Sequence, residues 1–208
     1  MIFFENLFRF KNKFIKKIDL DPSCNINFGS KKANEFFKKT LRKSSFYFEF
    51  GSGNSTILAE KFKKKFISIE LDKTFFKKVL GILKKNNKVK YIDIGPVGEF
   101  SYPLFKDRSK ILDYIKSINK YVKKKKFPNL ILIDGRFRVA CCINIFYLIK
   151  KYKHNPIIIL DDYKKRNCYK ILNKIFNIKL IGRMAILKIK KNKKSSTLKL
   201  NDYIFDSR

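Results

Sequence analysis

Long apolar runs are missing from this 208-residue chain. No stretch approaches the ~18 uncharged residues that are needed to cross a bilayer. From Arg9 onward the N-terminal segment carries a basic residue every few positions, and it lacks an apolar stretch with a small-residue cleavage site, so no signal peptide is expected. These absences predict a soluble, cytoplasmic protein without a membrane partner.

Cysteine and histidine are also scarce. The 4 cysteines form no CxxC pattern and the single histidine is His154, which disfavours a structural zinc site. Cys141 and Cys142 lie in an apolar helical pattern and are expected to be small buried side chains. A Ser/His/Asp triad would have to use His154, and no nucleophile-elbow sequence surrounds any serine. Zinc and serine-hydrolase chemistry are therefore disfavoured.

Acidic residues are few: the chain has 17 acidic residues and 50 basic ones, which gives a net charge of +33. Such a charge attracts polyanions and makes RNA an alternative partner. However, 42 of the basic residues are Lys and only 8 are Arg, and the lysines are spread over the whole chain. Lys, Ile, Phe and Asn share A/T-rich codons and fill 109 of the 208 positions. Codon bias and a solvated surface therefore explain the charge better than phosphate recognition, which favours Arg.

The apolar content is high enough for a substantial core, at 45% with 22 phenylalanines. We expect an accessory helical and loop region at 1–45, a main domain at 46–190 and a polar tail at 191–208. Within the accessory region, 3–18 is expected to form an amphipathic helix and 33–43 a helix that packs on the domain. The sequence predicts no oligomeric state.

Strands and helices alternate at least five times through the main domain. The expected strands are 46–50, 66–70, 89–94, 130–134, 157–161, 178–181 and 185–189, and the expected helices are 55–64, 73–85, 108–123, 138–151 and 164–176. This alternation predicts an α/β fold with a doubly wound, mostly parallel seven-stranded sheet and helices on both faces. Ligands of such sheets bind beyond the carboxyl ends of the strands.

Carboxylates recur where the expected strands stop, although they are few. The residues at these positions are Glu49, Glu70, Asp93, Asp134, Asp161 and Asp162. Because the carboxyl ends of parallel strands meet at one edge, this placement predicts a pocket lined by acidic side chains.

A glycine-rich turn, Glu49-Phe-Gly51-Ser-Gly53-Asn-Ser-Thr, joins the first strand to its helix. Glycine suits a sharp turn or the close approach of a ligand to the backbone, and the helix N-terminus offers free N–H groups. With the acidic end of the second strand, this turn resembles the class I S-adenosylmethionine-dependent methyltransferases over residues 46–190. An NAD-binding fold would require a third glycine where Thr56 stands.

The resemblance implies a Rossmann-like methyltransferase fold that uses S-adenosylmethionine. The residues that match the family's cofactor contacts are Glu49, Gly51, Gly53 and Ser55 for the turn and helix start, Glu70 for the ribose hydroxyls and Asp93 or Ile94 for the adenine. A non-catalytic Rossmann-like binding protein is a further alternative, although the intact turn argues against it.

The segment Ile131-Leu-Ile-Asp134-Gly-Arg136-Phe-Arg138 is similar to the Ile-Asp-Gly segment of methyltransferases of the catechol O-methyltransferase type. In the metal-dependent members of that group, an Asp after the fourth strand and an Asp-Asn pair after the fifth bind Mg²⁺. Asp134, Asp161 and Asp162 stand at the matching places, with Asp-Asp in place of Asp-Asn. The resemblance therefore raises Mg²⁺ as a second cofactor. Without it, Asp134 could position the nucleophile or act as the general base, with help from Asp162.

The acceptor is expected to be a small, anionic molecule. Arg136 and Arg138 could bind a carboxylate or phosphate through two parallel hydrogen bonds. Tyr163 follows the fifth strand, where it could shape an acceptor pocket. Alternatively, an Arg of this segment pairs with Asp161 or Asp162. The Asn/Asp-Pro-Pro-aromatic motif of adenine N-methylation is absent after the fourth strand. An RNA methyltransferase with a lysine-rich surface is the second hypothesis.

Overall fold

The computed structural model describes residues 20 and 23 and the ranges 25–84, 88–123, 126–190 and 198–208. The amphipathic helix expected at 3–18 lies outside these residues. None of the helices that the structure describes has the length and apolar character that crossing a membrane requires.

A seven-stranded sheet forms the centre of the molecule, in the order β3-β2-β1-β4-β5-β7-β6. The strands are β1 (Tyr47–Phe50), β2 (Phe66–Glu70), β3 (Val89–Tyr91), β4 (Leu130–Ile133), β5 (Ile157–Leu160), β6 (Phe176–Ile181) and β7 (Met184–Ile189). The first five strands pair in parallel, whereas β7 runs antiparallel to both β5 and β6. The sheet confirms the expected fold class.

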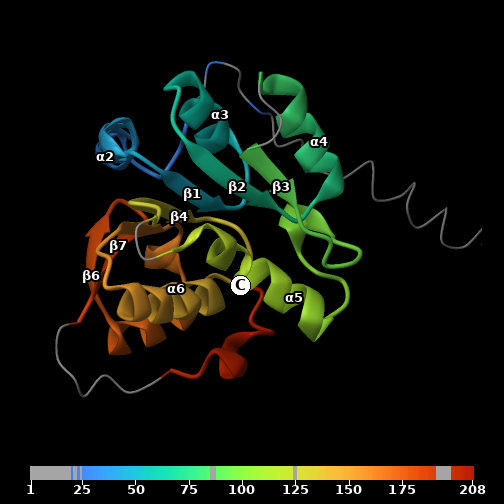
Figure 1. The fold of residues 1–208 in the computed structure, drawn as a ribbon, viewed down its shortest axis with the longest axis vertical. Helices are drawn as coiled ribbons and strands as arrows, with labels where there is room; N and C mark the ends of the chain where they lie inside the picture. Colours follow the sequence, from blue (N-terminus) through green and yellow to red (C-terminus); the bar gives the residue numbers. More distant parts are fainter. Residues whose placement is uncertain (1–19, 21–22, 24, 85–87, 124–125, 191–197) are drawn as a thin grey trace, which may run out of the picture.

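Helices cover both faces of this sheet (Figure 1). One face carries α2 (Lys31–Lys43), α3 (Asn54–Lys61) and α4 (Lys73–Ile82), and the other carries α5 (Arg108–Ile115) and α6 (Arg138–Tyr152). Side chains alternate along β1, so Tyr47 packs in the first layer while Phe48 and Phe50 pack in the second. As expected, α2 packs on the domain, with the Phe37 ring 6.0 Å from the Tyr47 ring.

The strand register brings the ends of β1, β2 and β4 to one edge. Phe50 lies opposite Ile69 on one side and Ile133 on the other. The residues that follow Phe50 therefore lie between Glu70 and Asp134. This edge is where the sequence predicts a ligand, and the expected bounds of these three strands agree with the structure to within one residue.

Three sequence-based expectations on secondary structure are wrong in detail. The segment expected as a helix at 164–176 forms two 3-10 helices, η4 (Tyr163–Lys165) and η5 (Asn167–Lys174), and Phe176 begins β6. The buried side chains of η5 are Tyr169 and Leu172, three residues apart, which suits the three-residue turn of a 3-10 helix. The third strand ends at Tyr91, and the helix expected at 108–123 divides into α5 and η3 (Ser117–Tyr121).

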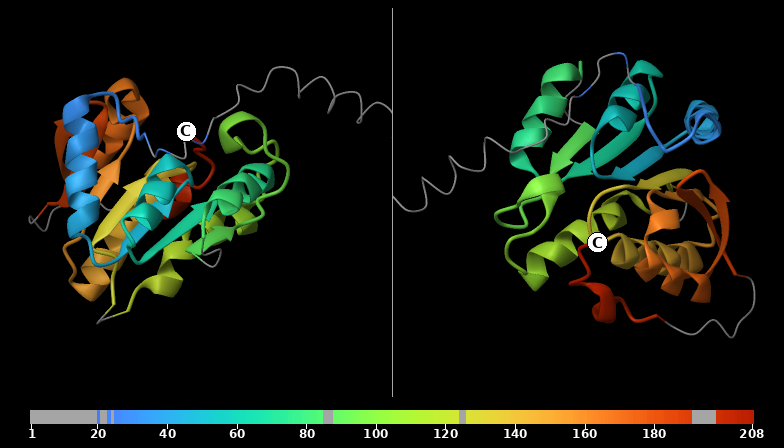
Figure 2. Two further views of the ribbon diagram at one scale, coloured as in Figure 1. Left: turned by 90° about the horizontal axis from the view of Figure 1, so that it is seen from above. Right: turned by 180° about the vertical axis from the view of Figure 1, so that it is seen from behind.

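The C-terminal residues 198–208 pack against α6, beside which they lie as the red segment in Figure 2. Leu198 and Ile204 are buried, and the Tyr147 hydroxyl donates a hydrogen bond of 2.8 Å to the carbonyl of Leu198. This part of the expected polar tail therefore contributes to the core.

Candidate functional site

The glycine turn after β1 lies against the turn after β4. Gly51 has a φ of +90°, which favours glycine, and its N–H donates to the Ile69 carbonyl at 2.8 Å. A Cβ on Gly51 would lie 2.8 Å from the Cα of Gly135, so no other residue fits there. A Cβ on Gly53 would meet nothing within 4 Å. Gly51 is thus required by the fold, and Gly53 presents an open backbone at the same turn.

Glu70 is joined directly to this turn. Its carboxylate accepts hydrogen bonds from the backbone N–H of Ser52 at 2.9 Å, Leu71 at 2.8 Å and Asp72 at 2.9 Å. The Ser101 hydroxyl donates a fourth at 3.1 Å. Burial raises the pKa of Glu70, and the three backbone N–H groups act in the opposite direction. The sequence-predicted partners, the glycine turn and the carboxylate after β2, are therefore in contact.

Glu49 is buried between β1 and the first turn of α3. Its fully buried carboxylate accepts hydrogen bonds from Tyr47 at 2.6 Å and Ser55 at 2.7 Å, and a third from Thr56. Burial raises the pKa of Glu49, and these hydroxyls oppose the shift. Glu49 and Ser55, both predicted as cofactor residues, bind each other here and fix the first turn of α3 to β1.

Asp93 lies on the surface after β3. Its carboxylate accepts from the Gly95 N–H at 2.9 Å and pairs with the Lys110 ammonium at 3.0 Å. These two groups lower the pKa of Asp93. The residue is exposed at the same edge as Glu70, where the adenine contact is predicted, but its carboxylate has local partners.

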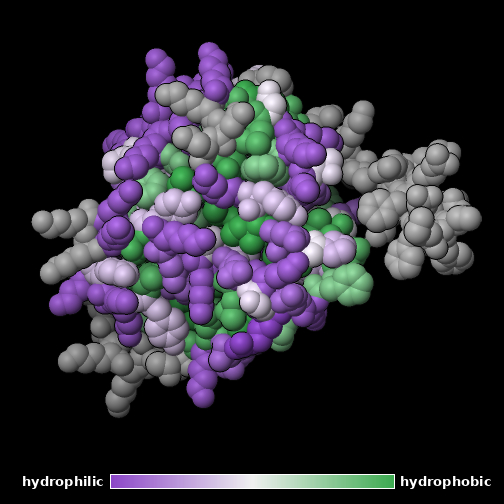
Figure 3. Space-filling view, turned by 45° about the vertical axis from the view of Figure 1, so that its right-hand side comes forward, coloured by the Kyte–Doolittle hydropathy of each residue, from purple (hydrophilic) through white to green (hydrophobic). Residues whose placement is uncertain are grey.

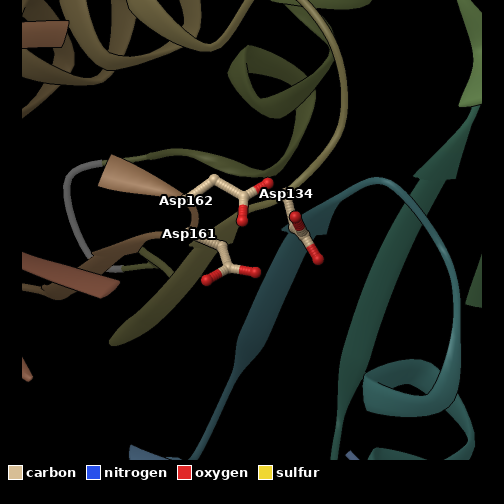
Figure 4. A group of neighbouring side chains, drawn as sticks. All are labelled: Asp134, Asp161 and Asp162. Carbon is tan, nitrogen blue, oxygen red and sulfur yellow. The ribbon is translucent and has the colours of Figure 1, made fainter. Parts of the chain in front are cut away.

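Three aspartates converge at the ends of β4 and β5, as Figure 4 shows. Carboxylate oxygens of Asp134, Asp161 and Asp162 all lie within 4.8 Å of one another. Asp161 is fully buried, whereas the side chains of Asp134 and Asp162 are 36% and 29% exposed. The sequence therefore predicted correctly that the three residues meet.

Arg138 holds the two strand ends together from the first turn of α6. Its buried guanidinium donates to the carbonyls of Gly135 at 2.8 Å, Asp161 at 2.9 Å and Asp134 at 3.0 Å. It also pairs with the carboxylates of Asp134 at 3.0 Å and Asp162 at 3.4 Å. A buried, charged donor with this many acceptors rigidifies the edge on which the site lies.

Two further arginines, Arg183 and Arg166, neutralise the negative charge of Asp161 and Asp162. Arg183, in the turn between β6 and β7, pairs with Asp161 at 2.6 Å and with Asp162 at 3.2 Å. Arg166 lies 3.6 Å from Asp162. Three guanidinium groups thus offset three carboxylates, and a divalent cation would have to displace them or lie beside them. The donor set does not fit the Mg²⁺ site that the resemblance implies, although the oxygen atoms are close enough together.

Asp134 differs from the other two aspartates in its electrostatic environment. Loss of hydration, reinforced by the carboxylates of Asp161 and Asp162, raises the pKa of Asp134 to about 7, and the Arg138 charge opposes the shift. Among the described residues, no hydrogen bond reaches its Oδ2 atom. A partly exposed carboxyl group with a pKa near neutrality can accept a proton at physiological pH.

Arg136 is a cation without a carboxylate partner in the described part of the chain. Its Nε donates to the Phe100 carbonyl at 2.7 Å, and its guanidinium carbon lies 5.6 Å from the centre of the Tyr102 ring. Desolvation, followed by the charges of Arg138 and Arg166, lowers the pKa of Arg136. An anion beside Arg136 would relieve this unfavourable environment.

Tyr163 is placed in the core. It is 8% exposed, and its hydroxyl accepts a hydrogen bond of 3.0 Å from the Asn173 amide. Its ring lies 6.3 Å from that of Tyr169. The structure thus gives Tyr163 a packing role next to the aspartates, where a substrate contact had been predicted.

Two important side chains of this edge were not identified from the sequence. Arg183 lies 22 positions beyond its partner Asp161, and Ser101 lies 31 positions beyond Glu70. The expected alternative that an Arg of the 136–138 segment pairs with Asp161 or Asp162 is confirmed by Arg138. Arginine is rare in this chain, so its recurrence near the aspartates was the one available signal.

The fold is also found in proteins of known structure. No family model and no curated protein matches the chain. It is similar to a methyltransferase-like protein from Silicibacter pomeroyi, with 23% identity over 84% of this chain and 93% of that one, and a TM-score of 0.66. It is also similar to the S-adenosylhomocysteine-bound methyltransferase PaMTH1 of Podospora anserina, with 12% identity over 90% and 95% of the two chains, and a TM-score of 0.49. The chain has the Rossmann-like methyltransferase fold.

Proposed function

We propose that this chain is an S-adenosylmethionine-dependent methyltransferase that acts on a small, anionic acceptor. The observation that supports it most strongly is the hydrogen bond from the Ser52 N–H to the buried carboxylate of Glu70, at 2.9 Å. It joins the glycine turn to an acidic strand end at the edge where sheets of this type bind ligands.

The residues of this edge fit a nucleoside cofactor. Glu70 Oε2 accepts from the Ser52 N–H and has a second lone pair for a ribose hydroxyl, and the adjacent hydroxyl could take the place of Ser101 on Oε1. The open backbone at Gly53, just before the first residue of α3, leaves room for close approach of the cofactor. S-Adenosylmethionine supplies, when bound, a methyl group on a positively charged sulfur. Glu49 and Gly51 act by holding this turn in place.

Asp134 and Arg136 are the proposed acceptor residues. Methyl transfer is an in-line displacement, so the protein must align the acceptor and remove its proton. Asp134, with its pKa of about 7, is suited to receive that proton. Arg136 is suited to bind an anionic group of the acceptor, since the described carboxylates leave it unpaired. Asp162 assists by fixing Arg138, which orients Asp134.

The proposal can be tested with S-adenosylmethionine that carries an isotopic label on its methyl group. The protein is incubated with this donor and either a low-molecular-mass cell extract or a total RNA fraction, and labelled products are identified by mass spectrometry. We expect label in a small molecule that bears a carboxylate or phosphate, and much less of it with the Arg136→Met variant. The Arg108→Met variant, altered on α5, is the matched control.

The alternatives give different results. Label in RNA would favour the RNA methyltransferase hypothesis. Figure 3 shows hydrophilic side chains distributed across the face it presents, as expected for a solvated surface. A protein that neither transfers label nor is stabilised by S-adenosylhomocysteine would contradict the proposed function.

A further inference from the structure

The segment after β3 forms a narrow loop that reaches back over the site. Its two arms pair through Val97 and Pro103, and the Gly98 N–H donates to the Tyr102 carbonyl at 2.7 Å. The tip is η2 (Glu99–Ser101). This tip and the residues that follow it expose large hydrophobic side chains, which are Phe100 at 60%, Tyr102 at 47%, Leu104 at 47% and Phe105 at 67%. The tip is therefore held by few packing contacts, whereas Val97 and Pro103 in the two arms are packed.

The tip is also conformationally strained. Phe100 and Ser101 have φ values of +53° and +59°, in the left-handed region that neither residue type favours. Such a conformation persists only where other contacts hold it. Loss of those contacts would therefore let the strain relax.

Two hydrogen bonds join the tip to other described segments of the chain, and they go to the two halves of the site. The Ser101 hydroxyl donates to Glu70 Oε1 at 3.1 Å, and Arg136 Nε donates to the Phe100 carbonyl at 2.7 Å. Ser101 thus places a hydroxyl on the carboxylate that is proposed to bind ribose hydroxyls. Arg136 at the same time donates to the Phe100 carbonyl through its Nε–H group, which is proposed to bind the anionic group of the methyl acceptor.

We propose that residues 99–101 form a latch that couples cofactor binding to exposure of the acceptor residue Arg136. The inference rests on the proposed function. A ribose hydroxyl replaces the Ser101 hydroxyl on Glu70, the strained tip relaxes, and the Phe100 carbonyl leaves Arg136. The cofactor therefore binds before the acceptor, and by linkage a bound acceptor anion strengthens cofactor binding.

The direct test is the affinity of the Ser101→Ala variant for S-adenosylhomocysteine, measured by isothermal titration calorimetry. Because the variant has lost the competing hydroxyl, we expect it to bind roughly three- to tenfold more tightly than the wild type. The matched control is Ser109→Ala, which removes an exposed hydroxyl from α5 and is expected to leave the affinity unchanged. An equal or weaker affinity of Ser101→Ala would overturn the latch.

A second test follows the tip itself. The chain has no tryptophan, so Phe100→Trp introduces a single fluorescent reporter at the tip, and Leu180→Trp on β6 serves as a remote control. We expect S-adenosylhomocysteine to change the emission of Trp at 100 and not at 180. In ¹H–¹⁵N spectra of the wild type, the Arg136 Nε–H resonance, identified by its loss in Arg136→Lys, should shift on the same addition.

The outcomes separate the latch from the proposed function. If S-adenosylhomocysteine binds the wild type but leaves the reporter and the Arg136 resonance unchanged, the latch is wrong and the methyltransferase proposal is unaffected. If it binds neither the wild type nor Ser101→Ala, both proposals fail.

Discussion

Gly51 and Gly135 touch backbone to backbone, so closely that a Cβ on Gly51 would lie 2.8 Å from the Cα of Gly135. The contact places the turn after β1 directly against the turn after β4. The turn that carries the proposed cofactor residues therefore packs against the turn that carries the proposed acceptor residues. A substitution at this contact should change the positions of both sets of residues.

The two glycines of the first turn should respond differently to replacement by alanine. Gly51→Ala introduces a strained positive φ, which alone costs about 1–2 kcal/mol, and a clash with backbone atoms adds to that cost. Gly53→Ala has room for its methyl group and should change the free energy of unfolding by less than about 1 kcal/mol, yet weaken binding of S-adenosylhomocysteine. Urea denaturation and calorimetric titration measure the two effects. Equal loss of stability in both variants would show that this division of roles is wrong.

Replacement of Arg138 should destabilise the protein much more than replacement of Arg136, which lies only two positions away. Arg138→Met leaves buried carboxylate and carbonyl groups without their donor and should lower the free energy of unfolding by about 3–5 kcal/mol. Arg136→Met removes a partly exposed cation without a carboxylate partner and should cost less than about 1 kcal/mol. Denaturant unfolding measures the free energy of unfolding of both variants. Similar decreases in the two variants would contradict the structural role assigned to Arg138.

The pH dependence of methyl transfer should report the ionisation of Asp134. Because its pKa is raised to about 7, the rate should be half-maximal near pH 7 and level off about one pH unit higher, where the carboxylate form is almost fully populated. The folded protein also binds this proton more tightly than the unfolded chain, so the same ionisation lowers stability as pH rises from the ordinary aspartate pKa to about 7. A rate that is independent of pH between 5 and 8, the range in which such a group titrates, would exclude Asp134 as the base.

Removal of divalent metal ions should leave the protein unaffected. The three aspartates already pair with Arg138, Arg166 and Arg183. We therefore expect neither EDTA nor added Mg²⁺ to change the thermal midpoint or the affinity for S-adenosylhomocysteine. A saturable rise of the midpoint with Mg²⁺ that Asp162→Asn abolishes would show instead that the aspartates bind the ion.

The sheet could be predicted from the sequence because each inner strand is a short apolar run bounded by turn or acidic residues. β4 and β5 are four-residue runs of Leu and Ile, and the carboxylates that follow them mark where each strand ends. Asp134, Asp161 and Asp162 were thereby predicted to lie together, as they do. The parallel register alone is enough to bring such strand ends to one edge.

The remaining site features depend on contacts between distant segments. Nothing local to Arg183 or Ser101 indicates that a turn and a loop bring them to Asp161 and Glu70. The expected helix at 164–176 was wrong for a related reason, since Tyr169 and Leu172 of η5 are buried against core side chains from other segments, which local composition does not reveal.

The central claim is that the glycine turn and Glu70 bind a sulfonium nucleoside, and calorimetric titration with S-adenosylhomocysteine tests it most directly. We predict one binding site per chain in the wild type. The binding free energy should be weaker by about 1–3 kcal/mol in Glu70→Ala and should be unchanged in the control Glu35→Ala on α2. No binding to the wild type, or equal affinity in all three proteins, would contradict the account.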